Sequence, residues 1–254
     1  MNPQNEYELK ALLHQFLSLG EALLANGAEI SRVEDTLTRL GLAYGAERMN
    51  VFVITSSMII TMIFPDGQEL TQTRRILSAG SSNFTKLEAL NALSRDCCRA
   101  PKPPKELAKA LAALDAAPPS RLRFYLGSVL AAGSFSIFFG GNIIDGLTAA
   151  LFAFPLCFLQ EKLPALCSSR VIYNFLISLL VGLALCGCAA LFPVLHIDKL
   201  IIGDIMLLIP GIAMTNAVRD ILIGDTIAGI MRLVETLLWA GALACGFMIA
   251  IMLI

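Results

Sequence analysis

Apolar and polar positions follow different patterns in the two parts of this 254-residue chain. Up to about residue 118, apolar residues recur at helical spacing or in short β-branched runs, with charged residues between them. From Phe124 onward they form runs of roughly 17 residues or more, long enough to cross a bilayer. The pattern predicts a multi-pass α-helical membrane protein. Residues 1–118 are expected to form an N-terminal cytosolic α+β domain, and residues 119–254 a transmembrane helical domain.

The first part predicts four helices and a small antiparallel sheet. Apolar residues three and four positions apart predict the helices, and the turn sequence Pro65-Asp66-Gly67 predicts a hairpin. The predicted helices are Tyr7–Asn26, Ala28–Ala43, Asn83–Arg95 and Lys105–Asp115. The predicted strands are Asn50–Thr55, Met58–Phe64 and Gln68–Arg74. A domain of this size can bury a modest core of its own.

Five apolar segments in the second part predict membrane spans. The link Gly141-Asn142 between the first two is so short that these two must form a tight helical hairpin. The positive loop residues Lys162, Arg170 and Arg219 are expected on the cytosolic side, which places the N-terminus inside and the C-terminus outside. The predicted spans are Phe124–Gly140, Ile143–Leu159, Val171–Phe192, Leu200–Val218 and Ile227–Ile254.

Composition supports a membrane protein and excludes several other classes. The chain is 56% hydrophobic and 15% charged, whereas soluble domains average about 25% charged residues. The sequence contains no basic tract of the kind that would predict a nucleic-acid partner. The seven cysteines lack the spacing of metal ligands, so neither a metal site nor a cofactor is expected. The sequence has no Walker-type phosphate loop, so we expect transport to be driven by an ion or proton gradient and not by ATP bound to this chain.

The segment from Gly203 to Gly241 is apolar yet carries many charges. Each charge at membrane depth costs about 3 kcal/mol, so such residues need partners, water or a function. Pro210-Gly211 predicts a break in the fourth span, and polar residues beside a broken helix form the substrate site of many secondary transporters. We therefore expect a substrate or ion pathway formed by Pro210, Gly211, Thr215, Asn216, Arg219, Asp220, Asp225, Arg232 and Glu235.

Structural explanations compete with this pathway. Pro210 can simply kink a helix, and Asp225 can cap the start of the last helix. Arg232 and Glu235 lie three residues apart on one helical face, so we expect them to pair with each other. Upstream, the charged residues of the run from Arg32 to Arg39 are, by spacing alone, typical of a solvated helix face.

Two stretches resemble a known family. PGIAMTNAVRDILIGDTIAGIMRLVETLL, from Pro210 to Leu238, resembles the signature of the threonine/serine exporter (ThrE) family of bacterial membrane proteins. GAEISRVEDTLTRL, from Gly27 to Leu40, is similar to the family's N-terminal motif. The resemblance covers essentially the whole chain. The resemblance makes Gly27, Arg32, Glu34 and Asp35 a candidate cytosolic motif. The spacing of these residues alone did not indicate a function.

The resemblance implies a secondary exporter that moves threonine and serine out of the cell across the bacterial cytoplasmic membrane. Full-length members carry a second hydrophobic half, so this chain resembles an N-terminal, split-subunit type. A second small integral-membrane subunit is the expected partner, besides the substrate and membrane lipid. Because split pairs are also associated with succinate, a C4 dicarboxylate is the alternative substrate. The acid-rich cluster favours a zwitterionic amino acid.

Two further classes remain less favoured alternatives. A membrane-anchored hydrolase would need a catalytic motif in residues 1–118, and no nucleophile elbow, HExxH or Cys/His pairing occurs there. If the first domain were a sensor and the membrane segments only an anchor, the spans would need no charged residues. The predicted spans of this chain do carry charged residues. We therefore expect a transporter and not an enzyme.

Overall fold

A computed structural model of the chain describes residues 3–76, 83–115, 120–167 and 169–254. Contacts divide the chain into two compact units. The first comprises Met1–Pro118 with Ile212–Leu233, and the second comprises Pro119–Gly211 with Val234–Ile254. The predicted domain boundary at residue 118 lies outside the described residues and stays a prediction.

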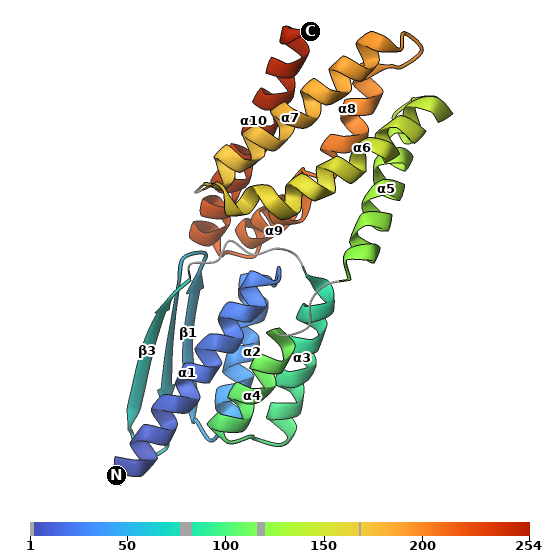
Figure 1. The fold of residues 1–254 in the computed structure, drawn as a ribbon. Coiled ribbons are helices and arrows are strands. Elements are labelled where there is room, and N and C mark those ends of the chain that lie inside the picture. Colours follow the sequence, from blue (N-terminus) through green and yellow to red (C-terminus); the bar gives the residue numbers. More distant parts are fainter. Residues whose placement is uncertain (1–2, 77–82, 116–119, 168) are drawn as a thin grey trace. The chain divides into compact units, whose positions relative to one another are not determined.

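The first unit is a three-stranded sheet covered by two layers of helices. Helices α1 and α2 pack on the sheet, and α3 and α4 pack on those two helices (Figure 1). The sheet is antiparallel in the order β1-β2-β3. Its strands are β1 (Arg48–Ile54), β2 (Ser57–Ile63) and β3 (Glu69–Arg75). Its helices are α1 (Pro3–Ala25), α2 (Ile30–Ala43), α3 (Phe84–Arg99), α4 (Pro104–Asp115), α9 (Gly211–Leu222, in this unit from Ile212) and the first turns of α10 (Thr226–Leu253).

The apolar periodicity of the sequence places the core of this unit. Alternate residues of β2, namely Met58, Ile60 and Met62, are buried under the helices. The apolar face of α2 is buried against the same core. The predicted turn is confirmed, because Gly67 has a φ of 79° and Asp66 Oδ1 accepts from the Gln68 amide at 3.1 Å. The predicted helices and strands of this region are confirmed with small shifts at their ends.

The second unit is helical throughout its described part. It contains α5 (Arg121–Phe138), α6 (Ile143–Lys162), the 3₁₀ turn η1 (Leu163–Ala165), α7 (Arg170–Leu191), α8 (Ile197–Ile205) and the part of α10 from Val234 onward. The tight hairpin predicted between the first two spans is confirmed. Asn142 and Asp145 form a capping box at the start of α6. A Cβ on Gly133 of α5 would lie only 2.9 Å from the Gly146 carbonyl oxygen, so the two backbones touch.

Among the described residues, three helices are long and apolar enough to cross a membrane, namely Ile143–Ala165, Arg170–Leu191 and Thr226–Leu253. The predicted count of five spans is not confirmed. Helix α5 begins with Arg121 and Arg123, which lower its mean hydropathy. Leu147, Leu151, Phe154 and Phe158 form an exposed apolar stripe on α6, as expected for a helix in contact with lipid.

The predicted break of the fourth span, Leu200–Val218, at Pro210-Gly211 is confirmed. Helix α8 ends at Ile205 and α9 begins at Gly211, so this stretch holds two helices of 9 and 12 residues. Each is shorter than the roughly 17 residues that a span needs. Pro210 disfavours helical backbone in the residue before it and lacks an N–H to continue the helix, which explains the interruption.

Candidate functional site

The two sequence motifs meet in the first unit. Gly27, in the link between α1 and α2, has a φ of 94°, which an L side chain rarely adopts, and its carbonyl accepts from Asn216 Nδ2 of α9 at 3.5 Å. Two residues on, Glu29 Oε1 accepts from Arg219 Nη1 of α9 at 2.5 Å. The link before α2 is therefore attached to α9 by two adjacent polar contacts, although the residues are about 190 positions apart in sequence.

A buried ion pair joins α9 to the first turns of α10. Arg232 Nη1 lies 3.0 Å from Asp220 Oδ2, the Asp220 side chain is fully buried, and that of Arg232 is 16% exposed. The expected Arg232–Glu235 pair is therefore wrong. Glu235 is exposed and makes no ion pair with any described residue. The tertiary approach of α9 gives Arg232 a closer and more deeply buried partner than its own helix does.

Two carboxylate oxygens of this cluster are buried without a hydrogen-bond partner in the described part of the chain. They are Glu29 Oε2 and Asp220 Oδ1. Asp225 and Glu29 add negative charge around Asp220, while Arg219 and Arg232 oppose it. A buried acceptor left unpaired costs about 1–3 kcal/mol. Both oxygens therefore have unused capacity to accept a hydrogen bond, and Glu29 also lines a cavity.

Glu29 lines a cavity of about 470 Å³ that contains groups of both charges. The cavity lies between the link before α2, the facing side of α3 and the start of α9. Its polar wall is formed by Glu29, Arg32, Asp35, Asn91, Arg95 and Asn216. A carboxylate and guanidinium groups on one cavity wall can bind a ligand that carries both charges.

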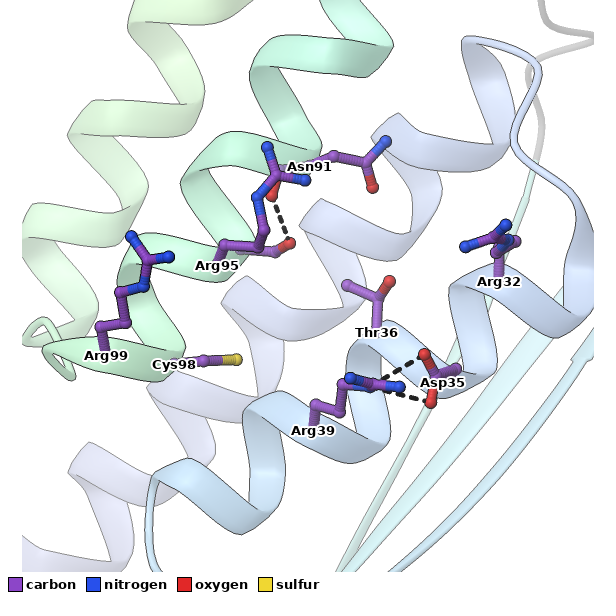
Figure 2. Close-up of a pocket in the computed structure, with 9 residues that line it drawn as sticks. Arg32, Asp35, Thr36, Arg39, Asn91, Arg95, Cys98 and Arg99 are labelled. Atoms are coloured by element: carbon purple, nitrogen blue, oxygen red, sulfur yellow. Dashed lines mark hydrogen bonds and ion pairs between the residues drawn. The ribbon is translucent and has the colours of Figure 1, made fainter.

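A second cavity of about 520 Å³ adjoins the first and shares Arg32, Asp35 and Arg95 with it. Figure 2 shows the residues that line it, among them Arg32 and Arg39 on α2 and Arg95 and Arg99 on α3. Asp35 is paired with Arg39 at 2.9 Å. The other three arginines have no carboxylate partner among the described residues, so this cavity is strongly electropositive.

Comparison with known proteins then decides the family. The threonine/serine exporter model, ThrE, matches residues 14–254. The chain belongs to the threonine/serine exporter family. This confirms the resemblance of the two motifs, and the family is one of transporters and not of enzymes.

One relative shows how much of a family member this chain represents. The "Threonine/serine exporter" of Corynebacterium glutamicum is 24% identical over 243 residues, which are 92% of this chain and 50% of the relative. The chain thus spans about half the length of the curated relative that it matches. No solved structure matches the chain.

The N-terminal motif of this family member divides into a cavity part and a structural part. Gly27 and Arg32 border the first cavity, whereas Glu34 faces the sheet. Glu34 Oε1 accepts from the Val53 amide of β1 at 2.9 Å. Burial raises the pKa of Glu34 above its ordinary value, and the Val53 hydrogen bond opposes that effect. Glu34 therefore holds α2 against β1, while Asp35 neutralises Arg39.

The predicted pathway residues of the family signature are divided between the two units. Thr215, Asn216, Arg219, Asp220, Asp225 and Arg232 belong to the first unit, and Pro210, Gly211 and Glu235 to the second. Pro210 lines a separate cavity of about 200 Å³ beside Arg170 and Trp239. The backbone carbonyl of Asp225 accepts from the Gly229 amide at 2.9 Å in the first turn of α10.

Sequence reasoning missed Glu29. Glu29 lies in the N-terminal motif, but the predicted functional residues of that motif were its neighbours Gly27, Arg32, Glu34 and Asp35. No sequence signal singled it out, because Glu is not among the residue types preferred at a helix N-cap. In the structure Glu29 is the N-cap residue, yet its side chain makes no capping bond and turns to Arg219 instead.

Proposed function

We propose that this chain is a subunit of a secondary exporter that moves threonine and serine out of the cell. Membership of the family supports this function, as does the name of the Corynebacterium glutamicum relative. The observation that carries the proposal is the mixed-charge cavity of the first unit. It combines the buried, unpartnered Glu29 Oε2 with Arg32 and Asn216.

The cavity has the groups that a zwitterionic hydroxy amino acid needs. The substrate ammonium would donate to Glu29 Oε2, which has no other donor among the described residues. The substrate carboxylate would bind the Arg32 guanidinium, whose planar N–H groups match a carboxylate. The Asn91 and Asn216 amides line the same cavity and can bind the substrate hydroxyl. Pocket volume permits this, since threonine is much smaller than about 470 Å³.

Charge at the same position argues against the alternative substrate. A C4 dicarboxylate would place its second carboxylate at Glu29, where the proposed pose of the amino acid has its ammonium group. Like charges at short range repel one another, most strongly where water is excluded. The amino acid is therefore the preferred cargo.

We place the protein in the bacterial cytoplasmic membrane, with its N-terminus cytosolic and its C-terminus outside. The loop charges Lys162 and Arg170 support this orientation by the positive-inside rule. We further propose that a second small integral-membrane subunit, corresponding to the remaining half of the Corynebacterium glutamicum relative, completes the exporter.

The test is threonine flux in liposomes that contain the full chain and that second subunit. Glu29→Gln should lower labelled-threonine flux about tenfold or more, because a hydrogen bond to a charged group contributes about 1.5–3 kcal/mol. The exposed Glu47→Gln on the same unit should leave flux unchanged. Arg219→Gln breaks the Glu29–Arg219 pair but keeps the carboxylate, so it should cost less than Glu29→Gln.

Three results would refute the proposal. Normal flux in Glu29→Gln would exclude this carboxylate as the ammonium partner. Equal losses in Glu29→Gln and Arg219→Gln would make the ion pair structural only. If the unsubstituted protein moved labelled succinate faster than labelled threonine, succinate and not threonine would be the preferred substrate.

A further inference from the structure

Asp204 of α8 is a buried carboxylate without a partner in the second unit. Its side chain is fully buried, and neither Oδ1 nor Oδ2 has a hydrogen-bond partner among the described residues. Asp145 of the same unit shows the contrast. It is equally buried, but it accepts from the backbone amides of Asn142 and His196 and from the His196 ring, each at 2.9 Å.

Helix α8 is tightly packed at Gly203, the residue before Asp204. Helix α8 packs against α5, α6 and α7. At the neighbouring Gly203, a Cβ would lie 2.7 Å from the Ala132 carbonyl oxygen and 3.1 Å from the Cβ atoms of Ala149 and Ser136. The Ser136 hydroxyl is also buried without a partner in the described part. The Asp204 side chain is itself fully buried, so no shell of water surrounds its carboxyl group.

No described cation compensates the Asp204 carboxylate. Among the described residues, the titratable side chain that faces it from a packed helix is the buried Cys157 thiol of α6. The other charged groups on these helices either are exposed, as Arg123 and Lys162 are, or have other partners. These contacts are Arg121–Glu161 at 3.9 Å, Asp145–His196 at 2.9 Å, Lys199–Asp198 at 2.9 Å, and Arg170 at 4.5 Å from the Trp239 ring centre.

Physical chemistry then fixes the protonation state of this side chain. An ionised carboxylate in an apolar interior, without donor or cation, is far less stable than the neutral acid. We propose that Asp204 carries a proton in this conformation and is the residue at which proton release and uptake are coupled to rearrangement of α8. The step is a simple exchange: the carboxylic acid gives its proton to water, leaving a carboxylate and hydronium, and later takes a proton back.

The position of Asp204 along its helix suits this exchange. Asp204 is the penultimate residue of α8, directly before the interruption that ends at Pro210. Its carbonyl accepts from the Leu207 amide at 3.1 Å in the closing turn. A short helix that ends beside a break can change its end without disturbing a long hydrogen-bond ladder. A local opening there would bring water to the carboxyl group.

Covalent labelling of the detergent-purified full chain tests the protonation. Dicyclohexylcarbodiimide reacts with protonated carboxyl groups in apolar surroundings, and mass spectrometry locates the modified residue. We expect labelling of Asp204 that falls as the pH of the reaction is raised. Asp204→Asn should lower this labelling to background. The matched control Asp198→Asn, which removes an exposed carboxylate of the same helix, should leave it unchanged.

Each outcome of the labelling decides for or against the proposal. An unlabelled Asp204 in the unsubstituted protein would overturn it, and so would labelling that sodium ions block while pH has no effect. Peptide mapping of the unsubstituted chain still decides if Asp204→Asn does not fold. As a second readout, the infrared band of a protonated carboxyl group should be lost in Asp204→Asn and kept in Asp198→Asn.

The coupling part rests on the proposed export function, so it is tested separately in liposomes that contain the complete exporter. Asp204→Asn mimics the protonated side chain. It should still exchange labelled threonine at equal concentrations but should lose accumulation driven by a pH gradient. Normal accumulation in Asp204→Asn would overturn the coupling. If the unsubstituted exporter moves no threonine, the export function fails, while the labelling result stands unaffected.

Discussion

At the scale of single residues, the described part of the chain holds three buried acidic side chains in three different ways. Asp145 has backbone and imidazole donors, Asp220 has the Arg232 guanidinium at 3.0 Å, and Asp204 has no partner among the described residues. Burial alone therefore does not define a function. What differs is whether the negative charge is compensated, and that difference separates structural carboxylates from the proposed proton site.

The Asp220–Arg232 pair predicts a pattern of stability. Asp220→Asn and Arg232→Gln should each destabilise the folded chain by about 3–5 kcal/mol, because each leaves one charge buried alone. The double variant should recover most of that loss. Thermal unfolding in detergent, followed by size-exclusion chromatography, measures the effect.

Glu235→Gln is the matched control for this pair. Glu235 is exposed and unpaired among the described residues, so its change should stay within about 0.5 kcal/mol of the unsubstituted chain. A larger loss for Glu235→Gln than for Asp220→Asn would contradict the observed pairing. Strict additivity of the two single losses in the double variant would contradict it as well.

At the scale of elements, α9 and α10 pack through a glycine in the first unit. A Cβ on Gly229 of α10 would lie 2.8 Å from the Ile221 amide nitrogen and 2.9 Å from the Ala217 carbonyl oxygen. These are backbone atoms, which cannot move aside as a flexible side chain can. The close approach brings Arg232, three residues further along α10, to Asp220 of α9.

Gly229→Ala should therefore destabilise the chain, by about 1–3 kcal/mol for an overpacked site. Gly241→Ala in the same helix is the control, because a Cβ there meets nothing within 4 Å. An alanine at an open helical position stabilises a helix by about 0.5–1 kcal/mol relative to glycine. Unfolding temperatures in detergent should thus shift in opposite directions, and equal shifts would exclude the close α9–α10 contact.

At the scale of the whole molecule, we keep the five-span topology expected from the sequence, in which the segments Phe124–Gly140 and Leu200–Val218 cross the membrane besides the three described helices that are long and apolar enough to do so. This topology places the two termini on opposite sides and the segment between α6 and α7 in the cytosol. A reporter that works only outside the cytosol should be active when fused after Ile254. It should be inactive when fused near Ala165, in the segment that carries Lys162 and Arg170. Fusions in whole cells measure this, and the reverse pattern would refute the orientation.

The sequence by itself determined the broad organisation of this protein. Periodicity placed the helices and strands of the first 115 residues to within a few positions, because burial on one face imposes a regular spacing. Long apolar runs marked three helices that can span a membrane, and two motifs identified the family. Pro210 also marked the break between α8 and α9, since proline disfavours helix through its own covalent geometry.

Only the tertiary structure decided which side chains pair with each other and how deeply each is buried. Sequence spacing paired Arg232 with Glu235, whereas the fold brought Asp220 of another helix closer. Glu29 gained its importance from Arg219 and Asn216, which lie far away in the chain. Asp204 ranked below the later charges until its burial was known. The physical reason is common to all three: helical periodicity specifies which face a residue occupies, but contacts between elements decide what that face meets.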